Sequence, residues 1–308
     1  MIRFLEAAGW HARHVLAAGC ILAMFLPALS AFLRPFLPYL VSMVLALAMA
    51  RIDLVAAARA AFRPRRLALL VGVSIALIPL AALGYGVIAR VAGLGDAERT
   101  ALVLLAAAPP IASSAGLCFL LGYNVRLAVE ITVSATLLTP LLGPLTVALV
   151  LPGSVALSPW DLGIRLGGMV VLGAAAAVAI RMLAGHERIA RRGRVFDGVA
   201  ALAMLLFVIP LFDRVPQLVL AEPMTALRIF ALAVVFNLGA NLVVRQGMRS
   251  VLPAATANAV GLLHGNRAIT LYLAALPFDP VFSMFVALYQ FPMYFTPILF
   301  DRKGAPVP

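Results

Sequence analysis

The sequence predicts an all-α, polytopic membrane protein, and three observations lead to this fold class. First, 64% of the 308 residues are hydrophobic and 12% are charged, whereas a soluble domain is roughly half apolar. Second, apolar runs close to the roughly 20 residues that a membrane helix needs recur from position 15 to position 300. Third, the basic residues stand in short clusters between these runs, which is typical of cytoplasmic loops.

The apolar runs predict ten transmembrane helices in a single unit over residues 1–308. The expected spans are 14–33, 37–51, 67–89, 100–121, 125–150, 162–184, 196–214, 225–244, 251–276 and 280–300. Most of the 24 basic residues then fall on one side of the bilayer, together with both termini. By the positive-inside rule that side is cytoplasmic. We therefore expect a multi-pass protein of a bacterial inner membrane, with the lipid bilayer as its partner and no nucleic acid.

The chain also shows a faint internal repeat. Thr139-Pro140-Leu141-Leu142 returns 157 positions later as Thr296-Pro297-Ile298-Leu299. With five helices in each half, residues 1–150 and 151–308 would be two repeats of inverted topology, a common plan for secondary transporters. The same offset places Pro109-Pro110 on Asn266-Arg267. These are the two places where an apolar run is interrupted, in the fourth and the ninth expected helix.

The fourth helix should break at Pro109-Pro110. Two consecutive prolines remove two backbone donors and block the preceding helical turn, and freed backbone groups cannot face lipid. Ser113 and Ser114 follow at the start of the second half-helix, where exposed N–H groups favour an anion. The alternative is a simple proline kink.

The ninth helix should break at His264-Gly265-Asn266-Arg267. An arginine at a helix centre costs roughly 2.5–3.5 kcal/mol on translocon scales, so this stretch should be buried in protein. The alternative is a loop between two helices, but the flanking pieces are too short to span a membrane alone. A broken helix whose two pieces meet inside the protein, with His264, Asn266 and Arg267 at the break, is compatible with both facts.

Glu130 is the only acidic residue well inside an expected span, since the other eleven lie in loops or near the span ends. A carboxylate within the membrane is a candidate for function. It lies one turn after Arg126, so an ion pair at the membrane interface is one interpretation. The other is that Glu130 is buried and either pairs with Arg267 or carries a proton.

The stretch 109–144 resembles the bile acid:sodium symporter family, which typically has Pro-Gly-Gly-x-x-Ser-Asn in helix 4, Gly-Asn-x-x-Leu before helix 5 and Ser-Pro-Leu at its end. The matching residues are Pro109-Pro110, Ala112-Ser113-Ser114, Asn124-Val125, Thr132 and Thr139-Pro140-Leu141-Leu142. Gly265-Asn266-Arg267-Ala268 likewise resembles the family's Gln-Asn-Ser-Gly in helix 9. The resemblance covers nearly the whole chain in order and spacing. It implies ten helices in a panel and a core domain, with helices 4 and 9 broken and crossing.

In that family, sodium binds around the crossing through side chains of helices 3, 4, 5 and 9. The resemblance places Ser114 and Thr132 on ligand positions and Ser74 on the helix 3 glutamine. Positions without a matching oxygen are Ala115, Ala128, Gly261 (or Ala259) in place of the glutamate, and Gly265. Sodium prefers several hard oxygens and, when buried, compensating charge. We therefore expect no cofactor and no intact sodium site; a sodium ion would have only Ser114 and Thr132.

These observations predict a secondary transporter for a small organic anion, not an enzyme. Arg267 would then act as a tethered cation in place of sodium, or would hold the carboxylate of the substrate. His264 or Glu130 would provide coupling to protons.

Three other functions are open. An arsenite-type exporter would rely on a helix 4 cysteine, and Cys118 lacks the matching context. An intramembrane hydrolase would pair Ser113 or Ser114 with His264, but no Gly-x-Ser-x-Gly or His-Glu-x-x-His accompanies them. A non-transporting scaffold would lack a polar centre. No nucleotide-binding loop is present in the sequence, so we do not expect ATP-driven transport by this chain alone.

Overall fold

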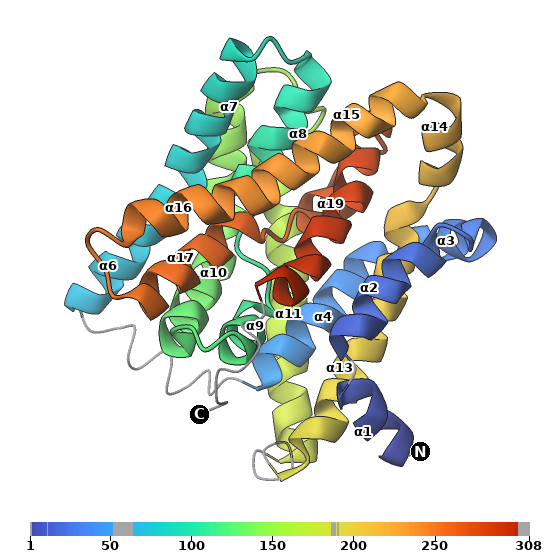
Figure 1. Ribbon diagram of the computed structural model, residues 1–308, viewed down its shortest axis with the longest axis vertical. Helices are drawn as coiled ribbons and strands as arrows, with labels where there is room; N and C mark the ends of the chain where they lie inside the picture. Colours follow the sequence, from blue (N-terminus) through green and yellow to red (C-terminus); the bar gives the residue numbers. More distant parts are fainter. Residues whose placement is uncertain (1, 11, 52–63, 186–188, 190, 301–308) are drawn as a thin grey trace.

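A computed structural model describes residues 2–10, 12–51, 64–185, 189 and 191–300 (Figure 1). Every regular element in these residues is helical, and their only β feature is an isolated antiparallel bridge between Pro110 and Arg267. The all-α class is thus confirmed for the described part of the chain.

The helices follow one another along the chain with short connections. Their bounds are α1 Ile2–Trp10, α2 Ala12–Ala23, α3 Pro27–Leu33, η1 Arg34–Phe36, α4 Leu37–Ala50, α6 Pro64–Ile75, η2 Ala76–Leu80, α7 Ala81–Val91, α8 Asp96–Ala107, α9 Ser114–Leu120, α10 Val125–Val150, α11 Pro159–Ala184, α13 Gly193–Val208, η3 Ile209–Phe212, α14 Val215–Ala221, α15 Pro223–Val234, η4 Val235–Gly239, α16 Ala240–Met248, α17 Ala254–Gly265, α18 Thr270–Ala275 and α19 Pro280–Leu299.

Six continuous helices in the described residues are long and apolar enough to cross a membrane. They cover Pro27–Ala50, Pro64–Val91, Val125–Val150, Pro159–Ala184, Gly193–Phe212 and Pro223–Met248. Large apolar side chains lie exposed along them, for example Leu149, Leu183 and Val243. Since water-soluble proteins rarely expose wide apolar patches, these surfaces indicate an integral membrane protein.

The first two expected spans are wrong in their boundary. We expected a break at 34–36, but α2 already ends at Ala23 and a continuous helix runs from Pro27 to Ala50. Pro27 occupies the first helical turn, where a missing N–H costs nothing. Pro35 is accommodated in the short 3-10 segment η1 and does not end the helix.

Two of the long helices contain a π-helical segment. In Pro64–Val91 it is η2, which includes Pro79, and in Pro223–Met248 it is η4. A π segment widens one helical turn and leaves backbone groups without their usual partners, and such segments are frequent at functional sites. In each half of the chain the π-containing helix precedes a broken helix and then a long last helix.

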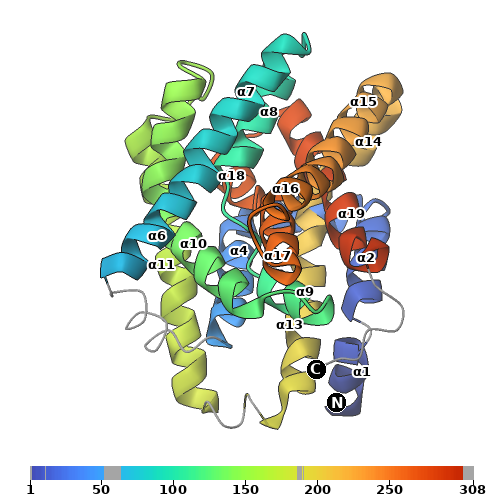
Figure 2. The same cartoon turned by 60° about the vertical axis from the view of Figure 1, so that its left-hand side comes forward.

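The two interruptions expected from the sequence are confirmed. The fourth expected helix consists of α8 and α9, which are separated at 108–113, and the ninth consists of α17 and α18, which are separated at 266–269. In Figure 2, α8 and α18 lie above the region of the two interruptions and α9 and α17 lie below it.

Two glycines let α17 approach η4 and α16 closely. A Cβ atom on Gly261 would lie 2.6 Å from the backbone oxygen of Asn241, and one on Gly265 would lie 2.5 Å from that of Asn237. Both distances are shorter than a real carbon–oxygen contact allows. The broken ninth helix is therefore pressed against the π-containing helix directly below its break.

Candidate functional site

The two breaks meet through the backbone. The amide of Ile111 donates to the carbonyl of Asn266 at 3.0 Å, and the amide of Ala268 donates to that of Pro109 at 2.8 Å. These bonds form the β-bridge between the breaks. They satisfy backbone groups that the interrupted helices leave open, as burial in a membrane requires. The predicted crossing of the fourth and ninth helices is present.

Arg267 lies at the centre of this crossing and is 2% exposed. Its Nη1 donates to the carbonyl of Ala108 at 2.9 Å, its Nη2 to that of Leu77 at 2.5 Å, and its Nε to that of His264 at 3.1 Å. The three acceptors come from the break after α8, from η2 and from the last turn of α17. Among the residues that the structure describes, Arg267 forms no ion pair with a carboxylate.

Two buried tyrosines satisfy further carbonyls at the ends of the half-helices. The hydroxyl of Tyr272 donates to Ala107 at 3.2 Å, and the hydroxyl of Tyr289 donates to Gly265. Both side chains are fully buried. A buried carbonyl without a donor would cost about 1–3 kcal/mol, so these hydroxyls stabilise the crossing.

Asn237, on the π segment η4, supports the other break. Its Nδ2 donates to the carbonyl of Gly265 at 2.7 Å and to Oδ1 of Asn266 at 3.2 Å. Its Oδ1 accepts from the hydroxyl of Thr296 at 3.2 Å. Asn237, Asn266 and Thr296 are all fully buried. Asn266, a predicted site residue, is thus bonded to Asn237 of η4, which in turn is bonded to Thr296 of α19.

His264 is half-buried beside the crossing. Its Nε2 lies 3.3 Å from the hydroxyl of Tyr85, and the two rings meet edge to face. Tyr85 also packs edge to face against Phe236 of η4. Within the described residues no hydrogen bond joins His264 to Ser113 or Ser114, so the pair that a hydrolase needs is not formed.

The predicted hydroxyl residues lie in three different environments. Ser114 and Thr132 are buried, and their hydroxyls have no hydrogen-bond partner in the described residues. Ser113 is half-buried. Ser74 is buried and donates to the carbonyl of Leu70 at 2.8 Å within its own helix. No hydrogen bond joins the Ser74 side chain to the crossing in the described structure.

The resemblance implies a sodium site near Ser114 and Thr132, and the residues around it do not fit that ion. Ala128, Cys118, Ile131 and Ala259, with three leucines, form a buried apolar cluster between the helices that would supply the ligands. An apolar lining gives a hard cation no oxygens.

The position that the resemblance assigns to the family's glutamate, Gly261, is also closed. Gly261 faces α16 so closely that no side chain fits there. No group of three or more His, Cys, Asp or Glu side chains is placed to hold a metal in the described ranges. Two hydroxyls without a negative charge are too few for buried sodium.

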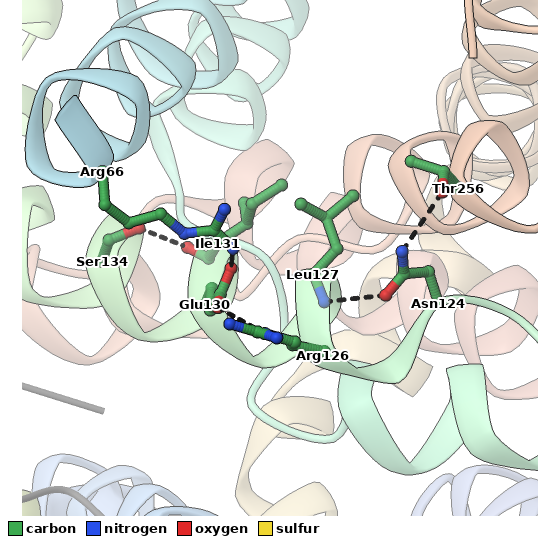
Figure 3. Close-up of polar contacts among 8 residues, drawn as sticks. All are labelled: Arg66, Asn124, Arg126, Leu127, Glu130, Ile131, Ser134 and Thr256. Atoms are coloured by element: carbon green, nitrogen blue, oxygen red, sulfur yellow. Dashed lines mark hydrogen bonds and ion pairs between the residues drawn. The ribbon is translucent and has the colours of Figure 1, made fainter. Parts of the chain in front are cut away.

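Glu130 does not belong to the crossing, which corrects one of the two interpretations of this residue. Its carboxylate pairs with Arg66 at the start of α6 and, at 3.1 Å, with Nε of Arg126 (Figure 3). These ion pairs join the start of α6 to the first part of α10, in a region rich in basic residues. Glu130 therefore has neither the contact with Arg267 nor the isolated position that a proton carrier at the crossing would need.

Asn124 ties the same end of α10 to α17. Its Oδ1 accepts from the amide of Leu127 at 3.0 Å, which caps α10, and its Nδ2 donates to Thr256 at 3.2 Å (Figure 3). An asparagine N-cap satisfies one of the free amides at a helix start. The bond to Thr256 fixes the start of the broken ninth helix against the fifth.

Two cavities lie away from the crossing. The larger, about 520 Å³, lies between the start of α8, the segment 154–156 and the segment 276–282. It is lined by Asp96 and Asp279 and by no basic residue, which disfavours an anion. The second, about 370 Å³, lies between α4 and α11 and includes Arg165. Neither is lined by Arg267 or Ser114.

Several residues of the crossing were not predicted from the sequence. They are Leu77, through its carbonyl, and the side chains of Tyr85, Asn237, Tyr272 and Tyr289. Two had a usable signal, because Pro79 interrupts the backbone near Leu77 and Asn237 is an amide inside an apolar span. The tyrosines look like ordinary membrane aromatics in the sequence.

No protein-family model matches the chain, and no curated protein matches it in sequence. The resemblance to the bile acid:sodium symporters rests on the motifs quoted above, and the function has to be argued from the crossing itself.

Proposed function

We propose that the chain is a secondary active transporter that moves a small organic anion by alternating access. The meeting of two interrupted helices at 109–111 and 266–268 carries the proposal. Discontinuous helices that meet inside the membrane are the usual way in which secondary transporters build a solute site. The bile acid:sodium symporters, which the motifs resemble, are proposed as functional relatives.

The proposed architecture is ten helices in two inverted repeats, 1–150 and 151–308. Its support is the same order of elements in both halves: a helix with a π segment, a broken helix and a long last helix. Thr139 and Thr296 are both buried and both donate to the carbonyl four residues earlier, at 2.7 Å. Both threonines precede a proline in the last helix of their half.

The proposed location is a bacterial inner membrane with both termini in the cytoplasm. Its support is the distribution of arginines, since most lie in the segments that this orientation places inside. With the opposite orientation, the clusters at 59–66 and 188–194 would have to be translocated.

The alternatives to transport are less well supported. A scaffold gains nothing from placing an arginine at mid-membrane, which costs several kcal/mol before compensation. A hydrolase needs a base bonded to its nucleophile, whereas His264 is bonded to Tyr85. Cys118 is buried in the apolar cluster, where an arsenite exporter would need an accessible thiol.

We place the solute beside the crossing, between the partly exposed Ser113 and His264. They stand on different broken helices, so movement of one half-helix relative to the other changes the access to both. Ser114, Thr132 and Asn266 lie deeper, and the free hydroxyls of the first two could bond a solute after such a movement.

The test is uptake by proteoliposomes of labelled organic anions, with taurocholate and small aliphatic carboxylates as probes. Ser113→Cys offers a control for specificity, because the two native cysteines, Cys20 and Cys118, are buried. We expect uptake above that of empty liposomes, and we expect a thiol reagent to block it only in Ser113→Cys. Alternating access would be contradicted if the thiol reagent labelled Ser113→Cys equally from both sides of the membrane at once and no uptake was found.

A further inference from the structure

We propose that Arg267 is a built-in cation, which holds the two broken helices together where an exchangeable cation would otherwise be needed. This deepens the proposed function, and only its consequence for coupling depends on transport. The argument rests on charges and contacts at the crossing.

Two helix C-termini converge on the guanidinium. α8 ends at Ala107 and α17 ends at Gly265, and each C-terminus carries about −0.5 elementary charge. Together they amount to about −1, and in a medium of low dielectric they would repel each other. Arg267 donates to the carbonyls of Ala108 and His264, at these two ends. Its single positive charge therefore balances both.

The third hydrogen bond of Arg267 joins a third helix to the crossing. Nη2 of Arg267 reaches the carbonyl of Leu77 in η2, at 2.5 Å. A bound ion would collect carbonyl oxygens from several segments in the same manner. Here the collecting group is attached to the chain, and its planar fork directs one donor to each segment.

A second cation at the crossing is disfavoured. The described residues place no carboxylate beside Arg267 that could balance another positive charge. The adjoining space is filled by the apolar cluster around Ala128 and Ala259. An added sodium ion would meet a fixed positive charge and few oxygens. We infer that the protein neither needs sodium for its folded state nor couples transport to it.

The contacts also decide between two roles for Arg267. To hold a carboxylate, the guanidinium would have to present its fork to a solute. Each of its three nitrogens already donates to a backbone carbonyl, and the side chain is 2% exposed. Neither cavity reaches it. Arg267 is thus a positioning residue, and the solute must be bound by other groups.

The experiment measures thermal unfolding of the purified full chain in detergent. A thiol-reactive dye reports unfolding, because Cys20 and Cys118 are buried in the folded protein. The variants are Arg267→Gln, which is neutral and can still donate hydrogen bonds, and Arg267→Lys, which keeps the charge. The matched control is Arg165→Gln, since Arg165 also donates to a helix C-terminal carbonyl, Ala275 at 2.9 Å, but on the surface.

We expect wild-type protein to have the same Tm in sodium, potassium and choline chloride. Arg267→Gln should lose several degrees, Arg267→Lys should retain most of the Tm, and Arg165→Gln should change little. A third variant, Arg267→Ala, removes the whole side chain. Adding guanidinium chloride at low millimolar concentration should raise its Tm and not that of wild type or Arg165→Gln.

The proposal is overturned if sodium raises the wild-type Tm above that in choline, or if Arg267→Gln is as stable as wild type. If Arg267→Gln does not fold, Arg267→Lys decides: a folded lysine variant supports the role of the charge, and an unfolded one overturns it. Once uptake of any probe is found, equal uptake with sodium and with choline outside is expected. These Tm measurements need no substrate, so they stand even if no transport is found.

Discussion

Nη2 of Arg267 and the carbonyl oxygen of Leu77 are joined by a hydrogen bond of 2.5 Å across 190 positions of sequence. One partner lies in the break of the ninth expected helix and the other in the π segment of the third. The carbonyl belongs to a π segment that contains Pro79, where the regular helical bonding pattern is interrupted. The π segment and the buried arginine in the helix break would each be unfavourable alone. The hydrogen bond between them compensates for both.

Replacing Asn237 by alanine should destabilise the fold strongly. The change leaves Oδ1 of Asn266 and the hydroxyl of Thr296 without this partner in a buried site, which costs about 1–3 kcal/mol. The matched control is Asn241→Ala on the neighbouring turn, because Asn241 is also buried but its Nδ2 has no partner among the described residues. Thermal unfolding in detergent should show a clear fall in Tm for the first variant and a much smaller one for the second. Equal falls in Tm for the two variants would mean that lost packing, and not lost hydrogen bonds, accounts for the effect of Asn237→Ala.

Gly265→Ala should also destabilise the protein, because its new Cβ would lie 2.5 Å from the backbone oxygen of Asn237. Forcing α17 away from η4 should cost about 1–3 kcal/mol, the usual range for overpacking. Gly72→Ala provides the control in a helix with open space around the new methyl group. It should be neutral or stabilising by up to about 1 kcal/mol, since alanine favours helix. A Gly265→Ala variant with the Tm of Gly72→Ala would contradict the close approach.

Gly143 and Tyr272 should behave as a coupled pair. A Cβ on Gly143 would lie 2.2 Å from the hydroxyl oxygen of Tyr272, which donates to the carbonyl of Ala107. Gly143→Ala should therefore lower the Tm in wild type and lower it much less in a Tyr272→Phe background, where the oxygen is absent. A double-mutant cycle measures the coupling, expected at about 0.5–3 kcal/mol for residues in contact. Additive effects would show that the two residues do not meet.

Glu130→Gln should have a modest effect that depends on salt. Glu130 pairs with Arg66 and Arg126, whose side chains are 35% and 80% exposed, and exposed pairs contribute about 1 kcal/mol or less. The difference in Tm between variant and wild type should shrink at high ionic strength. Asp197→Asn, which breaks the exposed pair with Arg51, is the control and should show the same trend. If Glu130→Gln abolished uptake at an unchanged Tm, Glu130 would have the proton-carrying role that its position here argues against.

The sequence alone predicted the fold class and both breaks, because their causes are local. Long apolar runs can be satisfied only as helices in lipid, and Pro109-Pro110 interrupts a helix in any context. The polar stretch His264 to Arg267 likewise cannot face lipid. The expected start of the second span is wrong, because Pro27 and Pro35 cannot be told apart in the sequence. Only packing decides that Pro27 starts the helix and that Pro35 lies inside it.

The partners of the polar residues were decided by the tertiary structure. Glu130 had two interpretations, and the start of α6, far away in sequence, brings Arg66 to it. Arg267 had two roles open, and the convergence of two helix ends with the carbonyl of Leu77 assigns it to the backbone. A freed carbonyl or amide can find its donor only after the helices have crossed. Its need for a partner is therefore visible in the sequence, but the identity of that partner is not.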